Sequence, residues 1–342
     1  MTTPKNRNCS IDIFRYLCAI MVVMIHTLPL SDLNPKLGYI ASEIVPRIAV
    51  PFFFTTAGYF YIPKLEKEEN PFFPYLKRLL FTYFVWSCLY YLIDFIQADQ
   101  MNPTEFIGDC FSRFFITGSH YHFWFFPALI FAVCFTTILF KLRLSKILIP
   151  LSVILYILGC LGCSYYYISI EIPIFEKLFT FSEFTLIRRV LLMGFPFFVS
   201  GYIIYKIRNV VLNKFTNKQL FLLWFASFII WLSEILTVRA FEWQLNIIIT
   251  FGLYLLVVIT LLVLIKNPLP QYKSLAVQSR TIANFTYYAH PFIIICLYFL
   301  FDGILHINLP ATVLFILTIT SSFIGGFIIY KWNHPFINRI VN

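Results

Sequence analysis

Three ionisable residues lie in the first apolar segment of the chain, at a spacing that suits chemistry inside a membrane. Asp12, Arg15 and His26 fall within residues 10–30. Charged groups are rare within membrane-spanning helices and are candidates for function there. At about 100° per residue, the step from Arg15 to His26 returns to within roughly 20° of the same helix face, after a rise of about 16 Å. We therefore expect the three residues on one stripe, in which Asp12 and Arg15 can pair.

His26 is the candidate general base of this stripe. A neutral imidazole can accept a proton from a hydroxyl group and return it near neutral pH. The alternative is structural: Asp12 and Arg15 form an interfacial ion pair, and His26 is a hydrogen-bonded packing residue. Both interpretations stay open on these residues alone.

A second apolar segment also carries charge. Glu43 and Arg47 are four residues apart, on one face of a helix, and Pro51 and Gly58 follow. An arginine this close to a proline and a glycine predicts an irregular helix that lines a polar cavity and contacts substrate. A structural ion pair between Glu43 and Arg47 is the alternative.

Four further residues could contact a substrate. His122 and Trp124 open an apolar segment, where the alternative is an aromatic anchor at the membrane surface. Arg188 and Arg189 open another, and they could pair with Glu183 or bind an anionic group. His290 precedes a proline, which loosens the backbone of a helix. All four of His122, Trp124, Arg188 and His290 are candidate substrate-binding residues.

We expect no metal site. Cys160 and Cys163 form a C-x-x-C pair inside an apolar run, where small packing residues are the more common interpretation. His120 and His122 have no carboxylate near them in the sequence, which makes a poor ligand set.

The elements that must position these residues are transmembrane helices. The 342 residues are 60% apolar and only 12% charged, against about 25% charged in soluble domains, so a soluble protein is excluded. A spanning helix needs about 20 mainly apolar residues. Ten segments meet this need: 10–30, 39–62, 79–97, 121–140, 147–167, 188–205, 219–237, 246–265, 284–305 and 311–330. The predicted fold class is therefore an all-α bundle of about ten transmembrane helices.

The basic residues predict the orientation of this bundle. Most of the 26 lysines and arginines, beginning with Lys5 and Arg7, fall on one side if both termini are cytoplasmic, whereas Asp99 and Asp109 fall on the other. This agrees with the positive-inside rule. Orientation therefore explains the net charge of +10 better than nucleic-acid binding does. We expect residues 1–342 to form one transmembrane domain without a separate soluble domain, in the cytoplasmic (inner) membrane of a bacterium.

The sequence lacks the G-x-S-x-G, P-loop, H-E-x-x-H and G-x-G-x-x-G motifs, so any chemistry must come from the bundle itself. Instead of these motifs, the chain has segments in which it resembles the acyltransferase-3 family of integral membrane acyltransferases. The segments that carry the resemblance are Ser10–Arg15 with His26, Arg47–Phe54 with Gly58, His122–Phe125, Phe197–Tyr202 and Tyr287–Pro291.

The resemblance implies about ten helices, cytosolic acyl-CoA as cosubstrate, and acyl transfer to a hydroxyl group, often on a sugar or cell-envelope polymer. It makes His26 the essential histidine, with Arg15 as its partner and Asp12 beside it. Lys77 and Arg78 match a basic cluster near the CoA entrance, where Phe81 replaces a second arginine of the family pattern. CoA phosphates need cations, and Lys77, Arg78 and Arg15 lie on the predicted cytoplasmic side.

The first two apolar segments, together with Tyr121–Ala128 and Gly162–Tyr166, carry a second likeness. In these residues the chain resembles the membrane half of vancomycin-resistance serine racemases, which is associated with serine uptake. Two functions therefore stay open. The first is an O-acyltransferase that modifies an envelope hydroxyl, with acetyl as the expected acyl group. The second is a transporter or exporter of a small polar molecule such as serine, in which the intramembrane charges line an alternating-access path.

Overall fold

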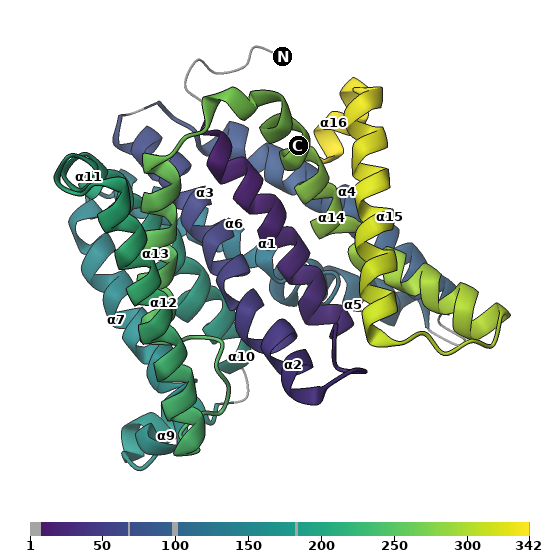
Figure 1. Ribbon diagram of the computed structural model, residues 1–342, viewed down its shortest axis with the longest axis horizontal. Helices are drawn as coiled ribbons and strands as arrows, with labels where there is room; N and C mark the ends of the chain where they lie inside the picture. Colours follow the sequence, from purple (N-terminus) through teal and green to yellow (C-terminus); the bar gives the residue numbers. More distant parts are fainter. Residues whose placement is uncertain (1–7, 68, 98–101, 182–183, 342) are drawn as a thin grey trace. The chain divides into compact units, whose positions relative to one another are not determined.

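The computed structural model describes residues 8–67, 69–97, 102–181 and 184–341, and within these ranges every regular element is a helix (Figure 1). Lys5, Arg7, Asp99 and Glu183, which entered the predictions above, lie outside the described residues. The chain forms two compact units. We call Met1–Phe52 with Leu264–Asn342 the terminal unit, and Phe53–Val263 the central unit.

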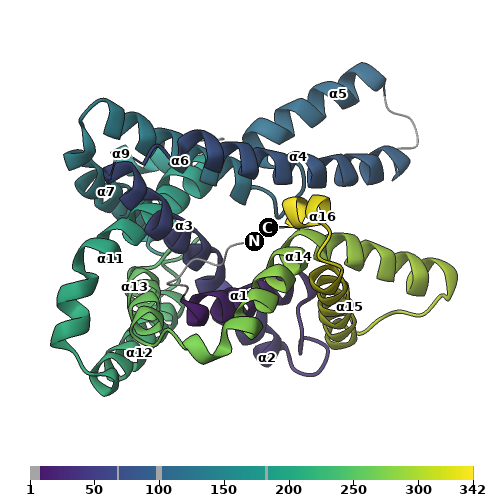
Figure 2. The same ribbon diagram turned by 90° about the horizontal axis from the view of Figure 1, so that it is seen from above.

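The terminal unit is built on three long helices that lie side by side in both views (Figure 1, Figure 2). α1 packs against α14 and α15, and α14 packs against α15. The elements of this unit are α1 (Cys9–Thr27), α2 (Pro35–Tyr39), η1 (Ile40–Ile44), η2 (Val45–Ile48), the start of α3 (Ala49–Glu66), η6 (Pro270–Tyr272), α14 (Lys273–Tyr298), η7 (Phe299–Ile304), α15 (Ala311–Trp332) and α16 (Pro335–Val341).

Hydrogen bonds fix α1 at both ends. At its start, the side chain of Asn8 accepts from the Ile11 N–H at 3.2 Å, which is N-terminal capping. The Cys9 N–H donates to the Pro268 carbonyl at 2.9 Å, just before α14. Past its end, the Leu30 N–H donates to Thr312 Oγ1 at 2.8 Å, at the start of α15. These bonds fix the position of α1 along the axes of its two neighbours, α14 and α15.

The second predicted segment is irregular, as expected, but its irregular part lies before Pro51 and Gly58, on which the expectation rested. It begins with the short helix α2, continues through the π-helical turn η1 and the 3₁₀ turn η2, and becomes a regular α-helix only at Ala49. Pro46 lies in η2, where its missing N–H suits a break in the α-helical bonding. Changes of helix type of this kind are frequent at functional sites.

The central unit holds the remaining helices. In Figure 2, α5 lies along α4, and α12 lies along α13. Its elements are most of α3, then α4 (Phe72–Gln97), α5 (Pro103–Ser112), η3 (Arg113–Thr117), α6 (Phe125–Lys141), η4 (Ser145–Ile147), α7 (Leu148–Leu161), α8 (Tyr166–Ser169), α9 (Pro173–Phe179), α10 (Phe184–Ile187), η5 (Arg188–Gly194), α11 (Phe195–Lys214), α12 (Asn217–Ala240) and α13 (Phe251–Lys266).

Two glycines let α3 and α11 approach closely. A Cβ atom at Gly58 would lie 1.7 Å from the Phe198 carbonyl oxygen, and one at Gly201 would lie 2.1 Å from the Thr55 carbonyl oxygen. Beside them, the hydroxyl groups of Thr55 and Ser200 are hydrogen-bonded at 2.9 Å. Small residues of this kind pack membrane helices against each other. Gly58 and Gly201 therefore hold the backbones of the central unit together.

Glu234, a carboxylate in the middle of the apolar helix α12, stabilises the start of α13. Its Oε1 accepts from the Phe251 N–H at 2.8 Å, and its Oε2 accepts from the Gly252 N–H at 2.5 Å. The Tyr165 hydroxyl donates to the same carboxylate at 3.0 Å. The first N–H groups of a helix lack partners within the helix and favour negative charge. This charge within an apolar helix therefore has a structural explanation.

Among the residues that the structure describes, seven helical stretches are long and apolar enough to cross a membrane: Cys9–Thr27, Pro35–Glu66, Phe72–Gln97, Phe184–Lys214, Asn217–Ala240, Pro270–Ile304 and Ala311–Trp332. Three shorter apolar helices, Phe125–Lys141, Ser145–Leu161 and Phe251–Lys266, fall where the other three spans were predicted. The all-helical fold with several candidate spans is thus confirmed, whereas the count of ten spans and the cytoplasmic termini stay predictions.

The glycine contact predicts the effect of a single methyl group. Gly201→Ala would force the backbones of α3 and α11 apart, and we expect it to lower the free energy of unfolding by about 1–3 kcal/mol, the usual effect of overpacking. The matched control is Gly108→Ala in α5, because a Cβ atom there meets nothing within 4 Å. Thermal unfolding of purified protein in detergent measures both. Equal melting temperatures for the two variants would contradict the proposed packing.

Candidate functional site

Two histidines predicted as site residues meet in the terminal unit. The rings of His26, on α1, and His290, on α14, are stacked with centroids 5.3 Å apart and planes 24° apart. The His290 side chain is fully buried, and His26 is half-buried. The candidate general base of the sequence analysis therefore has a second imidazole against its face.

The fold explains why these rings lie at one level. His26 and His290 are equally far from the first residues of their helices, Cys9 and Lys273, at a rise of about 1.5 Å per residue. The bond from the Cys9 N–H to Pro268 places the start of α1 beside the start of α14. Helices that begin together and run side by side bring equally distant residues to the same depth.

Arg15 lies on α1 on the helix face predicted to hold His26. Its side chain is half-buried, and its Nε is buried without a hydrogen-bond partner among the residues that the structure describes. Asp12 is buried in the first turn of α1, and the ion pairs of the described residues do not include one between Asp12 and Arg15. The guanidinium group of Arg15 can therefore serve an anionic ligand.

Glu43 and Arg47 bind each other. The Arg47 Nη2 pairs with Glu43 Oε2, and the Arg47 Nε donates to the Glu43 carbonyl at 2.8 Å. This is the structural pair that the sequence left open as an alternative. The pair lies in the irregular segment η1–η2, where the opposite charges of the two side chains neutralise each other. Contact of either residue with substrate stays a prediction.

Lys77 and Arg78 lie near the start of α4 with exposed side chains. The Arg78 guanidinium lies 5.5 Å from the centre of the Tyr75 ring. Neither residue forms an ion pair with a carboxylate in the part of the chain that the structure describes. Two exposed, adjacent cations are suited to phosphate groups.

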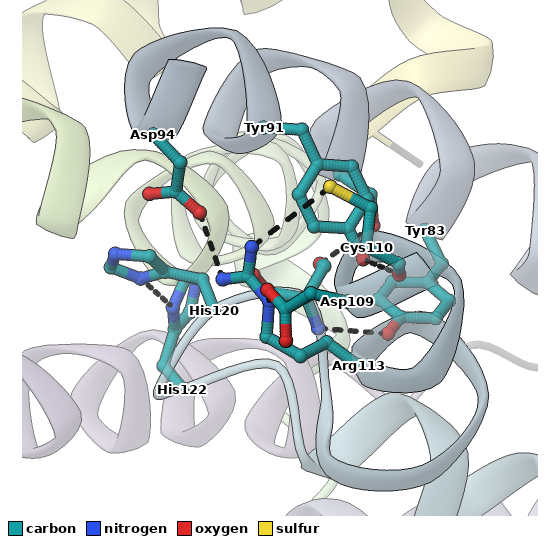
Figure 3. Close-up of polar contacts among 10 residues, drawn as sticks. Tyr83, Tyr91, Asp94, Asp109, Cys110, Arg113, His120 and His122 are labelled. Atoms are coloured by element: carbon teal, nitrogen blue, oxygen red, sulfur yellow. Dashed lines mark hydrogen bonds and ion pairs between the residues drawn. The ribbon is translucent and has the colours of Figure 1, made fainter. Parts of the chain in front are cut away.

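The central unit contains a charged cluster that the sequence did not predict (Figure 3). Arg113 Nη1 lies 2.8 Å from Asp94 Oδ2, and Arg113 Nε lies 2.8 Å from Asp109 Oδ2. Burial of the guanidinium opposes its charge, but the hydrogen bond that Arg113 donates to Asp94 and the negative charges of Asp94 and Asp109 prevail and raise the pKa of Arg113. The sequence signals were an aspartate inside the predicted third span and the four-residue spacing of Asp109 and Arg113.

His120 and His122 lie beside this cluster. Their Nδ1 atoms are 3.3 Å apart, so one donates and the other accepts. The Tyr90 ring stacks on His120 with centroids 4.4 Å apart. Burial lowers the pKa of His120 to about 4, with Asp94 opposing and Arg113 assisting. His120 is therefore neutral at pH 7. No group of three or more potential metal ligands gathers within the described ranges.

Trp124 contacts an arginine, though not Arg188, the arginine predicted to bind substrate. The Arg189 guanidinium lies 5.5 Å from the centre of the Trp124 ring, a cation–π distance. Arg188, its neighbour in η5, lies beside the Cys163 thiol. The predicted pairing of Arg188 with Glu183 falls outside the described residues. Two adjacent arginines in a π-helical turn keep the prediction of an anionic ligand here open.

Comparison with known proteins identifies a family that matches almost the whole chain and relatives that match about half to two thirds of it. The family described as "Acyltransferase domain" matches residues 8–331. An "Amino-acid racemase" of Enterococcus faecalis is 31% identical over 66% of this chain and 32% of its own length. A "Serine/alanine racemase" of Enterococcus gallinarum is 30% identical over 49% of this chain and 25% of its own length. The chain thus spans about a third or less of the curated relatives it matches. No solved structure matches it.

The pKa of His120 predicts a pH dependence of stability. When the pH falls from about 6.5 to about 4, the unfolded chain takes up a proton at this residue and the folded chain does not, so folding loses stability over that window. His120→Phe retains a ring beside Tyr90 and removes this loss. Its melting temperature should therefore fall less than that of the wild type between pH 7 and pH 4.5.

The control for this prediction is His306→Gln, because His306 is exposed in the loop before α15. Its melting temperatures should follow those of the wild type at each pH. If His120→Phe instead followed the wild type across this pH range, the assigned environment of His120 would be wrong.

Proposed function

Because the chain belongs to the acyltransferase domain family, we propose that it is a membrane-embedded O-acyltransferase that transfers an acyl group from cytosolic acyl-CoA to a hydroxyl group. The observation that carries the proposal is the position of His26 in a chain of this family: half-buried on an apolar helix, and stacked on a second histidine. Several apolar helices and the family together indicate a multi-pass membrane protein. The bacterial cytoplasmic membrane is its proposed location.

The proposed reaction is one displacement at the thioester. His26 accepts the proton of the acceptor hydroxyl while the hydroxyl oxygen forms a bond to the acyl carbon. The C–S bond then breaks, CoA leaves as the thiolate, and the proton on His26 passes to that sulfur. A general base contributes about 10²–10⁴-fold, so the negative charge that develops on the carbonyl oxygen needs a cation or donor as well.

Arg15 is the proposed phosphate-binding cation of the terminal unit. Its guanidinium is half-buried, lies on α1 with His26, and forms no ion pair with a carboxylate in the described part of the chain. In water-poor surroundings such a charge acts strongly on a CoA phosphate, whereas the rise of about 16 Å between Arg15 and His26 leaves the oxyanion to a donor nearer His26. Asp12, buried one turn before Arg15 at the N-terminus of α1, is favoured by the helix dipole there.

Acyl-CoA is the proposed cosubstrate, bound by cations at the cytoplasmic surface. Lys77 and Arg78 are exposed and adjacent, and they lie before the apolar part of α4 on the side that the basic residues predict to be cytoplasmic. Phosphate groups of CoA would form charge-assisted hydrogen bonds with them. The acceptor, proposed as a hydroxyl of an envelope glycan, would come from the opposite side, where Arg188, His122 and Trp124 are predicted.

Transport of a small amino acid is the second candidate function. Its basis is the names of two relatives, an amino-acid racemase and a serine/alanine racemase, of which this chain spans only a part. Serine carries a hydroxyl and opposite charges, which the intramembrane polar groups could bind. Under our first proposal, proteoliposomes with the protein and without acyl-CoA should take up serine no faster than empty vesicles. Faster uptake would favour transport.

Replacement of the proposed base gives the main prediction. Purified protein in lipid should transfer or hydrolyse the acyl group of radiolabelled acetyl-CoA, and His26→Ala should slow this by about 10²–10⁴-fold. His306→Ala, which removes an exposed histidine, should retain wild-type turnover. Thermal unfolding checks that both variants are folded. Full turnover by His26→Ala would show that another group accepts the proton.

A further inference from the structure

Pro291 leaves one backbone carbonyl of α14 without its helical donor. The proline lies inside the helix Lys273–Tyr298, and proline has no N–H. In an α-helix the N–H of residue 291 would donate to the carbonyl four residues before it. The carbonyl of Tyr287 therefore needs another donor in surroundings that offer no water.

The preceding side chain supplies that donor. His290 Nδ1 lies 3.0 Å from the Tyr287 carbonyl oxygen and 3.1 Å from the Thr286 carbonyl oxygen. A carbonyl oxygen only accepts, so the proton of the imidazole must be on Nδ1. The proline thus selects one tautomer of His290, and in the neutral ring the lone pair is on Nε2.

This tautomer-fixed ring is the one that stacks on His26, at 5.3 Å between centroids. The electron-rich face of an aromatic ring attracts a cation within about 6 Å of its centre. When His26 takes up a proton it becomes such a cation. Two imidazoles this close do not readily both carry charge, because like charges oppose each other. Charge is disfavoured most on the ring of His290, because that ring is fully buried.

We propose that His290 is a positioning residue for the transfer: Pro291 fixes it as the Nδ1–H tautomer, and its neutral face orients the ring of His26 and stabilises the imidazolium that forms there. This inference rests on the proposed function of His26 as the base. It assigns His290 to the transition state instead of substrate binding, and it explains why a proline follows this histidine.

Two variants separate the roles of the ring. His290→Asn keeps an N–H that can reach the carbonyls of Thr286 and Tyr287, but it removes the ring face. We expect it to lower kcat for acetyl-CoA turnover by roughly 3- to 30-fold, as a lost cation–π contact would, and to leave KM unchanged.

His290→Phe combined with Pro291→Ala keeps a ring face, and the new backbone N–H at 291 satisfies the Tyr287 carbonyl. Its kcat should stay within about threefold of that of Pro291→Ala alone.

The outcomes are distinguishable. Wild-type kcat in His290→Asn, or a kcat of the double variant as low as that of His290→Asn, would overturn the proposal. A second measurement does not need turnover: ¹⁵N NMR of histidine-labelled protein in nanodiscs should show the Nδ1–H tautomer at His290, assigned by loss of its signal in His290→Asn. The Nε2–H tautomer would overturn the proposal. Absence of acyl transfer by the wild type would refute only the proposed function.

Discussion

Apolar surroundings offer no water to a buried polar group, so each such group must find its partner within the protein. The arrangement of this chain follows from that constraint. Glu234 accepts hydrogen bonds from the first N–H groups of α13, and Arg113 is paired with Asp94 and Asp109. Glu43 and Arg47 neutralise each other. Arg15 is a charged side chain without such a carboxylate in the described residues, which is why it points to a ligand.

The same constraint connects the backbone of α14 to the proposed chemistry. A proline removes one helical hydrogen bond, the side chain of the preceding residue replaces it, and the replacement determines which nitrogen of His290 carries a proton. The position of this ring against His26 depends in turn on bonds at the two ends of α1, from Cys9 to Pro268 and from Leu30 to Thr312. The local chemistry of one helix thus depends on the register of its neighbour.

Much of the helical fold could be predicted from the sequence, because whether a segment forms a helix depends mainly on residues close together in the chain. Apolar runs gave the helices, and the charge and proline content of residues 39–62 gave an irregular segment, which the structure confirms. The stacking of His26 on His290 and the pairing of Asp94 with Arg113 could not be predicted. They join residues on different helices, and helical periodicity gives the face on which a residue lies but not its neighbour. The segments that carry the family resemblance also contain residues with a purely structural role. Gly58 and Gly201 lie in these segments, yet both serve helix packing.

The central claim is that acyl transfer takes place at His26, and a structure with a bound acyl-CoA analogue tests it most directly. Cryo-electron microscopy of the protein in nanodiscs, with an acetyl-CoA analogue in which a methylene group replaces the thioester sulfur, would locate the acyl carbon. This carbon should lie beside the His26 ring, with room for a hydroxyl oxygen at about 3–3.5 Å from it, and His290 should still be stacked on His26. An acyl group bound away from α1, or rings of His26 and His290 that are separated in the bound state, would contradict transfer at His26.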